Sequence, residues 1–284
     1  MKKRCKQIML LLGVTVICAA LLLLPKETNR DTYVLPVLLY HHFADTVTAD
    51  TVVSPQRFRE QMEALCDAGY VTVTLRQIEE FVDQGIPLPE KSVLITIDDG
   101  YTSNLTIAAP ILQELGMCAT VFVIGIYEGE SINPHSRNPL YPVRFSYQEA
   151  MEWVESGVLD LQCHTFDMHQ LAGDGFSGRD GILRLQGEDT ASYCEALRMD
   201  MREFARRRDK HGVPTRLVAL AYPYGYVAGE ATLPLQSEGI RFTFTVAQHT
   251  NVLRMGDETC LWNMGRFNVT ERDRGKVLVR RLES

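Results

Sequence analysis

The stretch Val93-Leu94-Ile95-Thr96-Ile97-Asp98-Asp99-Gly100-Tyr101 is an apolar run that ends in two adjacent carboxylates. A short, β-branched run of this kind is typical of a strand buried on both faces of a parallel sheet. The two carboxylates then lie at the carboxyl end of the strand, where parallel α/β folds place their active sites. Two such charges beside a core call for a metal ion or a shared proton, although Asp and Gly also form ordinary solvated turns.

Strand-like and helix-like segments alternate on both sides of this run. We expect strands at 34–40, 70–74, 92–97, 118–124, 159–163, 217–221 and 242–246. We expect helices at 54–69, 75–84, 103–115, from Ser146 onward, at 188–211 and at 230–238. This alternation predicts one α/β domain over residues 35–284, with a parallel sheet that is either open or closed into a barrel.

A second polar cluster, Cys163-His164-Thr165-Phe166-Asp167-Met168-His169, follows the expected strand 159–163. Histidines five residues apart do not share a helix face, so their joint use requires a loop. With one of the carboxylates they supply two imidazoles and an oxygen, a set that holds a divalent metal and leaves positions open for water and substrate. A purely structural pair of histidines is the alternative for this cluster taken alone.

Two further segments follow expected strands and reach the same rim. Tyr222-Pro223-Tyr224-Gly225 offers aromatic rings that can line a sugar site, or that pack only against their own loop. His41 and His42 follow the first strand and bring an imidazole to the rim, unless they are strand-end histidines without a role.

The N-terminal segment 1–25 combines four cations, Lys2, Lys3, Arg4 and Lys6, with an uncharged apolar run over residues 8–24. It predicts a signal peptide or, as the better match, an uncleaved membrane anchor, followed by a linker at 26–34. The rest of the chain is then exported. Without those four cations, 25 basic and 36 acidic residues remain, about −11 in net charge, which argues against a nucleic-acid partner.

Thr96 to Tyr101 resembles the first motif of the polysaccharide deacetylase family (carbohydrate esterase family 4, NodB homology domain), and His164 to His169 resembles its second. The five-residue histidine spacing, Pro36 to His41 and Ala221 to Gly225 are similar to the branch that deacetylates poly-N-acetylglucosamine. The resemblance covers residues 35–269. It implies a distorted (β/α) barrel with fewer than eight repeats.

The resemblance also implies the roles of the site residues. Asp99, His164 and His169 match the ligands of a divalent metal, usually Zn²⁺, and Asp98 matches the catalytic base. The backbone N–H of Tyr224 is expected to hold the oxyanion.

Two positions depart from the family pattern. The arginine that commonly precedes the Pro-aromatic motif is absent, so we expect Arg266 to orient Asp98 instead. The late Leu-x-His motif is not evident, and similarity to the branch with rearranged motifs makes His41 the expected acid, with His42 and His249 as weaker candidates.

The function implied is a metal-dependent hydrolase at the cell membrane, facing outward, or secreted if the leader is cleaved. It removes N-acetyl groups from an extracellular N-acetylglucosamine polysaccharide, an exopolysaccharide or peptidoglycan, and releases acetate. The alternatives are hydrolysis of another amide or of an O-acetyl ester by the same fold, and a noncatalytic wall-binding protein.

Overall fold

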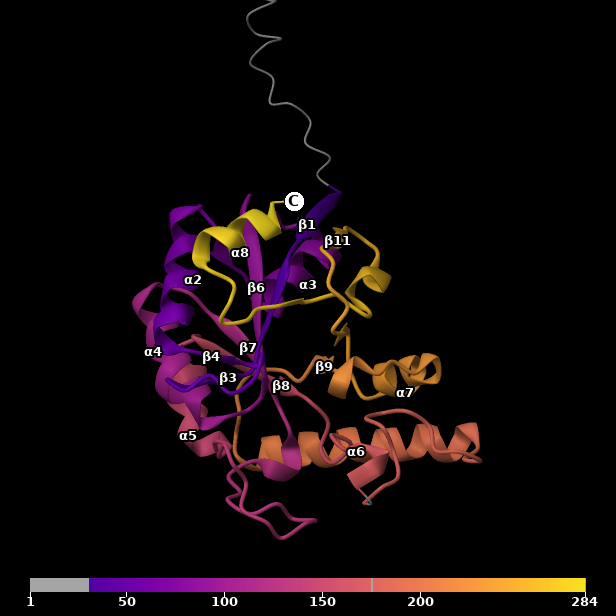
Figure 1. The fold of residues 1–284 in the computed structure, drawn as a ribbon. Helices are drawn as coiled ribbons and strands as arrows, with labels where there is room; N and C mark the ends of the chain where they lie inside the picture. The colour runs from indigo at the N-terminus through magenta and orange to yellow at the C-terminus, as the bar shows by residue number, and fades with distance from the viewer. Residues whose placement is uncertain (1–30, 175, 284) are drawn as a thin grey trace, which may run out of the picture.

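The computed structural model describes residues 31–174 and 176–283 (Figure 1). The segment expected to be a membrane anchor, 1–25, lies outside these residues. Within the described residues, none of the helices combines the length and apolar character that a membrane span requires.

A parallel sheet of eight strands forms the centre of the protein. Its strands follow one another in space in the order β10-β9-β8-β7-β6-β2-β12, and β5 pairs with the start of β6. All eight residues of β6 are buried, as its apolar sequence predicts. The bounds are β2 (Val37–Tyr40), β5 (Val71–Thr72), β6 (Ser92–Asp99), β7 (Ala119–Val123), β8 (Leu159–Cys163), β9 (Ala219–Ala221), β10 (Phe242–Phe244) and β12 (Phe267–Asn268).

The segment from Met264 to β12 closes the sheet into a barrel. The Met264 N–H donates to the Thr243 carbonyl (2.8 Å), and the Thr245 N–H donates back to Met264 (2.9 Å), which ties this segment to β10. Three residues later, Phe267 pairs with Leu38 of β2. The distorted barrel with fewer than eight repeats, expected from the sequence, is therefore confirmed.

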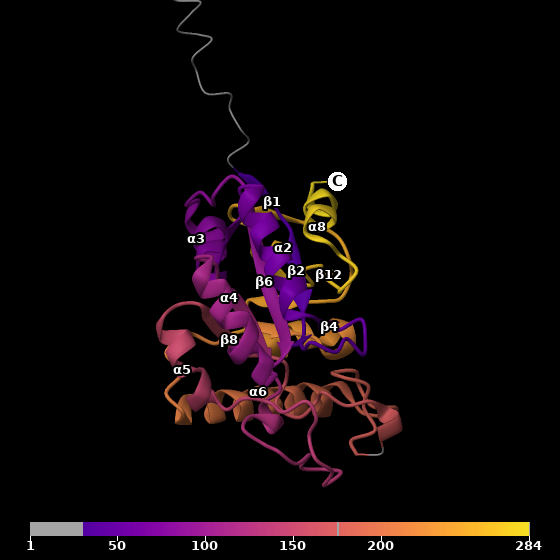
Figure 2. The ribbon, with the colours of Figure 1, turned by 60° about the vertical axis from the view of Figure 1, so that its left-hand side comes forward.

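Helices cover the outside of the barrel. Figures 1 and 2 show α6 lying crosswise to the strands and α2 beside α8. The α2–α8 contact is close, since a Cβ at Gly275 would meet the Ala64 side chain at 2.5 Å. The bounds are α2 (Pro55–Asp67), α3 (Leu75–Gln84), α4 (Ala109–Glu114), α5 (Tyr147–Glu155), α6 (Thr190–Lys210), α7 (Thr232–Ser237) and α8 (Gly275–Leu282).

The structure corrects two expected elements. Pro36 has no N–H to donate, and it divides the strand expected at 34–40 into β1 (Thr32–Leu35) and β2. The helix expected at 103–115 is a π-helical turn, Asn104–Ala108, followed by α4. Pro110 accounts for this change, because its ring clashes with the carbonyl four residues earlier and its missing N–H breaks the α-helical ladder.

Short strands complete the fold around the barrel. β1 pairs antiparallel with β11 (Asn251–Arg254), and β3 (His42–Phe43) pairs in parallel with β4 (Val52–Val53). The sequence did not predict five of the observed elements: β3, β4, β11, β12 and α8.

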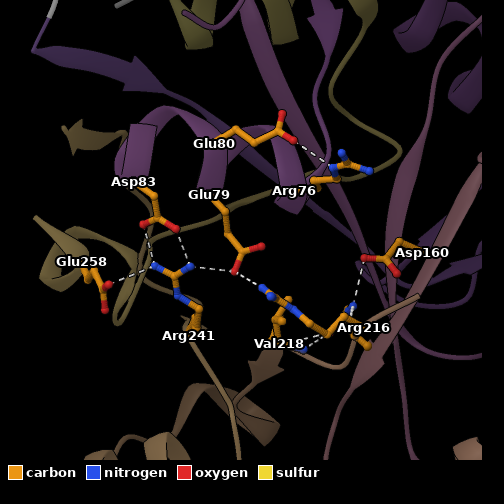
Figure 3. A network of polar contacts seen from close by, with 11 residues as sticks. Arg76, Glu79, Glu80, Asp83, Asp160, Arg216, Val218, Arg241 and Glu258 are labelled. Carbon is orange, nitrogen blue, oxygen red and sulfur yellow. Dashed lines mark hydrogen bonds and ion pairs between the residues drawn. The ribbon is translucent and has the colours of Figure 1, made fainter. Parts of the chain in front are cut away.

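A cavity of about 610 Å³ lies at the amino-terminal ends of β8 and β9, among charged side chains. Arg241 contacts the carboxylates of Asp83, Glu79 and Glu258 there, and Glu79 also contacts Arg216 (Figure 3). This ion-pair network is at the end of the barrel opposite to the carboxylates of β6. It is therefore separate from the site described next.

Candidate active site

The parallel register brings the polar residues that follow three strands to one level. Tyr40 of β2 pairs with Ile97 of β6, Asp99 with Val123 of β7, and Val123 with Cys163 of β8. The residues at the carboxyl ends of these strands are therefore neighbours around the rim: His41, Asp98, Asp99 and His164.

Asp99, His164 and His169 converge as a triad that could hold a metal. Asp99 Oδ1 lies 3.6 Å from His164 Nε2 and 3.5 Å from His169 Nε2. The ligand atoms of all three residues lie within 4.8 Å of one another. Neighbouring ligands of a tetrahedral zinc ion with bonds of 2.0–2.1 Å are about 3.3 Å apart, so the two distances from Asp99 are close to those around a small divalent ion.

The other ring nitrogens of both histidines are occupied, which favours metal binding through Nε2. His164 Nδ1 lies 2.8 Å from the carbonyl oxygen of Ala221, so Nδ1 is the donor to that oxygen and Nε2 is the nitrogen that faces Asp99. His169 Nδ1 lies 3.2 Å from the Tyr224 hydroxyl. A hydrogen bond to the distal nitrogen is the usual way in which proteins orient histidine ligands. The residues present therefore fit a divalent cation.

The charge states of the triad also suit a cation. Burial raises the pKa of Asp99, but the neighbouring His169, His41 and His164 more than offset this and leave it below the usual range. Burial, followed by the charge of His164, lowers the pKa of His169 to about 4. At neutral pH the site therefore offers a carboxylate and a neutral imidazole, the forms that bind metals.

Arg266 holds Asp98, as the sequence predicts. Its Nη1 and Nη2 donate to Asp98 Oδ1 at 2.7 Å and Oδ2 at 2.8 Å. Burial alone would raise the pKa of Asp98, but the charges of Arg266 and then His164 keep it below the ordinary value. Asp98 Oδ2 lies 3.8 Å from His164 Nε2. Asp98 is thus an ionised carboxylate beside the triad and is not needed to complete it.

Of the three candidate acids, His41 lies at the carboxylates. Its charge is among those that lower the pKa values of both Asp98 and Asp99, after burial and the nearer charges. Its Nδ1 is buried without a hydrogen-bond partner among the described residues. His42 instead places Nδ1 2.8 Å from the Ser103 hydroxyl, and His249 is exposed with Nδ1 near the Thr250 carbonyl.

The loop Tyr222–Gly225 borders the triad, but its residues differ in orientation. Tyr224 has a left-handed backbone (φ 57°), and its ring, 39% exposed, lies 4.6 Å from the His169 ring. Gly225 has φ 75°, and a Cβ there would meet Val246 at 2.4 Å. Tyr222 continues the pairing with β10 through its N–H and is buried in the core. Its ring therefore cannot stack on a sugar, contrary to the expectation that it lines the site.

The histidine loop is supported by residues that the sequence did not indicate. The backbone N–H groups of Phe166 and Asp167 donate to Asp200 of α6 at 2.7 and 2.8 Å. Asp167 Oδ1 lies 2.6 Å from His135 Nε2 on the 128–144 loop. No sequence motif marks Asp200 or His135, because both act through contacts between segments that are remote along the chain.

Comparison with known proteins agrees with this geometry. Residues 85–243 match the family model described as polysaccharide deacetylase. The chain belongs to this family.

The similar proteins include enzymes and a solved structure. The chain is 28% identical over 212 residues to the poly-beta-1,6-N-acetyl-D-glucosamine N-deacetylase of Escherichia coli K12, covering 68% of this chain and 31% of that protein. It is 28% identical over 196 residues to the enzyme of the same name from Staphylococcus epidermidis, covering 69% and 62%. The structure of IcaB from Ammonifex degensii superposes with a TM-score of 0.68 and 25% identity, covering 88% of this chain and 97% of that one.

The chain spans less than two thirds of the length of the curated relatives it matches. What their names say of activity and substrate belongs to those proteins.

Proposed function

We propose that this protein is a metal-dependent hydrolase that removes N-acetyl groups from an N-acetylglucosamine polysaccharide and releases acetate. The observation that carries the proposal is the convergence of Asp99, His164 and His169 beside the paired carboxylate of Asp98. Membership of the polysaccharide deacetylase family and the likeness to poly-N-acetylglucosamine deacetylases support it.

In this proposal Asp99, His164 and His169 hold the metal, for which Zn²⁺ suits the donor set of one oxygen and two nitrogens. A bound divalent ion supplies Lewis-acid polarisation of the acetamide carbonyl and lowers the pKa of water at the site.

Asp98 then acts as the general base. Arg266 fixes both of its oxygens and keeps it ionised, so it is ready to accept the proton of the attacking water. His41, on the adjacent strand end, donates a proton to the leaving nitrogen as the C–N bond breaks. The backbone at Tyr224, held in its left-handed conformation, borders the position where the oxyanion develops.

We further propose that the protein acts outside the cell, held by segment 1–25 as an anchor, or secreted if that segment is removed. The cations Lys2 to Lys6 and the apolar run behind them support this placement.

The test is acetate release by the full-length chain from N-acetylglucosamine oligomers and from peptidoglycan, before and after chelation, and with Zn²⁺ restored. We expect loss of release on chelation and recovery with metal. Release from O-acetylated glycans alone would instead favour an esterase, and metal binding without release from any substrate would overturn the proposal.

Three variants separate the roles. Asp98→Asn should abolish turnover and retain metal, whereas His164→Ala should lose both. Asp209→Asn, an exposed position on α6, is the control and should retain both. Substantial activity in Asp98→Asn would contradict its assignment as base.

A further inference from the structure

Arg144 is fixed beside the metal-ligand strand by backbone pairing. The Thr102 N–H donates to the Val143 carbonyl (2.9 Å), and the Phe145 N–H donates to the Gly100 carbonyl (3.1 Å). These bonds flank an antiparallel bridge between Tyr101 and Arg144. Residues paired across such a bridge project their side chains to the same face. Arg144 is therefore held next to Tyr101, two residues after Asp99.

The guanidinium of Arg144 is held in place without a counter-ion. Its Cζ lies 4.0 Å from the centre of the Tyr101 ring and 5.7 Å from that of Tyr127, and Nη1 donates to the Pro142 carbonyl at 2.7 Å. The Nε atom is buried and has no hydrogen-bond partner. Across residues 31–174 and 176–283, Arg144 takes part in no ion pair. Its positive charge is thus not held in a salt bridge, although it acts on the Asp99 carboxylate, whose pKa it lowers after burial and the three histidines.

The charge of Arg144 extends into the site. Burial and then Arg144 lower the pKa of His42, whose ring lies 5.0 Å from Tyr101. Arg144 is also among the charges that act on His169, after burial and His164. The positive charge of Arg144 therefore also acts on a ligand that binds beside Tyr101 and His169.

Asp99, the nearby carboxylate on which Arg144 acts, is a candidate metal ligand, and the other described carboxylates near this wall form no ion pair with Arg144. Arg266 is paired with Asp98, and Asp167 is hydrogen-bonded to His135. Asp174 lies near Tyr224, whose pKa it helps to raise after burial, and Asp174 Oδ2 accepts the Leu171 N–H at 2.9 Å. The rim thus has an unpaired cation at Tyr101 and an anion on the loop beyond the histidines.

On the basis of the proposed function, we propose that Arg144 determines specificity by charge. It disfavours binding of a substrate in which the sugar next to the reacting acetamide already carries an ammonium group. An acetamido group is neutral at every pH of interest, whereas the amine left by deacetylation is a base that carries a positive charge when it is protonated. A fixed like charge is a common means of rejecting a wrong ligand. Each turnover would therefore make the adjacent sugar a poorer substrate, and the enzyme would leave deacetylated sugars apart from one another.

The test compares two N-acetylglucosamine hexamers, one fully acetylated and one with a single interior glucosamine. The measured quantity is the ratio of their kcat/KM values. We expect the wild-type protein to favour the acetylated hexamer. Arg144→Gln should reduce this ratio about three- to tenfold, the effect of one charge at a distance of several ångströms in a partly solvated site.

Three controls distinguish charge from structural damage. Arg144→Lys retains the charge and should keep most of the ratio, and Arg76→Gln removes an equal charge from an exposed position beside the opposite cavity. The preference should also weaken as the salt concentration rises from 0.05 to 0.5 M, as expected for about a threefold shorter Debye length. A second readout is the equilibrium affinity of the metal-free protein for a glucosamine hexamer, which Arg144→Gln should increase and Asp174→Asn should decrease.

The outcomes separate the two proposals. Acetate release by the wild-type protein with an unchanged ratio in Arg144→Gln would overturn the charge assignment alone. An equal loss of kcat/KM on both hexamers would also overturn it, since that is the effect of a structural defect. No release from either hexamer by the wild-type protein would overturn the proposed function and this inference with it.

Discussion

Arg266 and Asp98 form two parallel hydrogen bonds between residues that are 168 positions apart in sequence. The arginine side chain is fully buried and its Nε donates to the Thr245 carbonyl at 2.9 Å, while the Asp98 side chain is 3% exposed. A bidentate pair of this kind fixes both the charge and the orientation of the carboxylate.

Replacing Arg266 should affect stability and activity separately. Arg266→Met leaves Asp98 buried without its partner, and we expect it to lower the free energy of unfolding by about 3–5 kcal/mol in denaturant titration. Arg266→Lys keeps a charge but loses the planar pair, so we expect lower kcat with a smaller loss of stability. The double variant Asp98→Asn, Arg266→Met should recover part of the stability. If it recovers none, the stability lost in Arg266→Met does not come from the unpaired carboxylate.

Removing the Tyr224 hydroxyl should weaken metal binding. Tyr224→Phe leaves His169 Nδ1 without its partner, and loss of such an outer contact lowers metal affinity about tenfold or more. Competition with a chelator of known affinity measures this directly. Tyr226→Phe is the matched control. Tyr226 is as exposed as Tyr224, but its recorded ring contact is with Tyr224 and not with a candidate metal ligand. Equal metal affinities of the two variants would show that the Tyr224 hydroxyl does not support His169 as a ligand.

Asp200 predicts a pH dependence of stability. Burial raises its pKa to about 7, although the N–H groups of Asp167 and Phe166 oppose the rise. An unfolded aspartate has a pKa of about 3.9, so between about pH 4 and 7 the folded protein binds the extra proton. Stability from this group is therefore complete below pH 4 and falls as the pH rises to 7, by about 2–4 kcal/mol.

The measurement for Asp200 is the difference in unfolding free energy between wild type and Asp200→Asn from pH 4 to 8. Asparagine does not titrate, so the wild type should lose stability relative to the variant as the pH rises. Asp209→Asn, exposed on the same helix, should show a constant difference from wild type. A constant difference for Asp200→Asn as well would contradict the raised pKa.

The ion-pair network around Arg241 should contribute to stability and not to catalysis (Figure 3). Arg241 makes a bidentate contact with Asp83 at 2.7 and 2.8 Å, which lowers the pKa of that carboxyl. We expect Arg241→Gln to cost about 1–2 kcal/mol at pH 7, and Arg76→Gln, at an exposed i,i+4 pair, less than about 0.5 kcal/mol. Because the pKa of Asp83 is lowered in the fold, the Arg241 contribution should disappear as the pH falls below about 4. If Arg241→Gln lost acetate release without losing stability, the network would contribute to catalysis and this prediction would be wrong.

Local patterns predicted the alternation of strands and helices and the grouping of two histidines with a carboxylate, whereas the barrel and the choice of Asp99 followed from the family resemblance. β6 was recognised from its apolar run, although it continues to Asp99 because Asp98 and Asp99 still pair with β7. β8 and α3 have the expected bounds, the helix because Thr74 and Gln77 form a capping box and Gly85 ends it.

The elements that were missed lack such patterns. β12 has two residues and pairs only because the barrel closes there. Arg144 and Asp200 resemble other surface arginines and aspartates in sequence, and only the folded loops bring them to the site. The burial of Tyr222 could not be predicted for a related reason. The direction of its side chain depends on continued pairing with β10.

Closure of the barrel by the segment at 264–268 bears on how the protein is made. Asp98 leaves the ribosome long before Arg266, so the buried carboxylate has no partner until Arg266, 168 residues later, has been synthesised. A nascent or prematurely terminated chain that ends before Arg266 therefore contains every candidate metal ligand but cannot stably bury Asp98. We expect such fragments to remain open and sensitive to proteases, so that the active centre forms only once Arg266 is present.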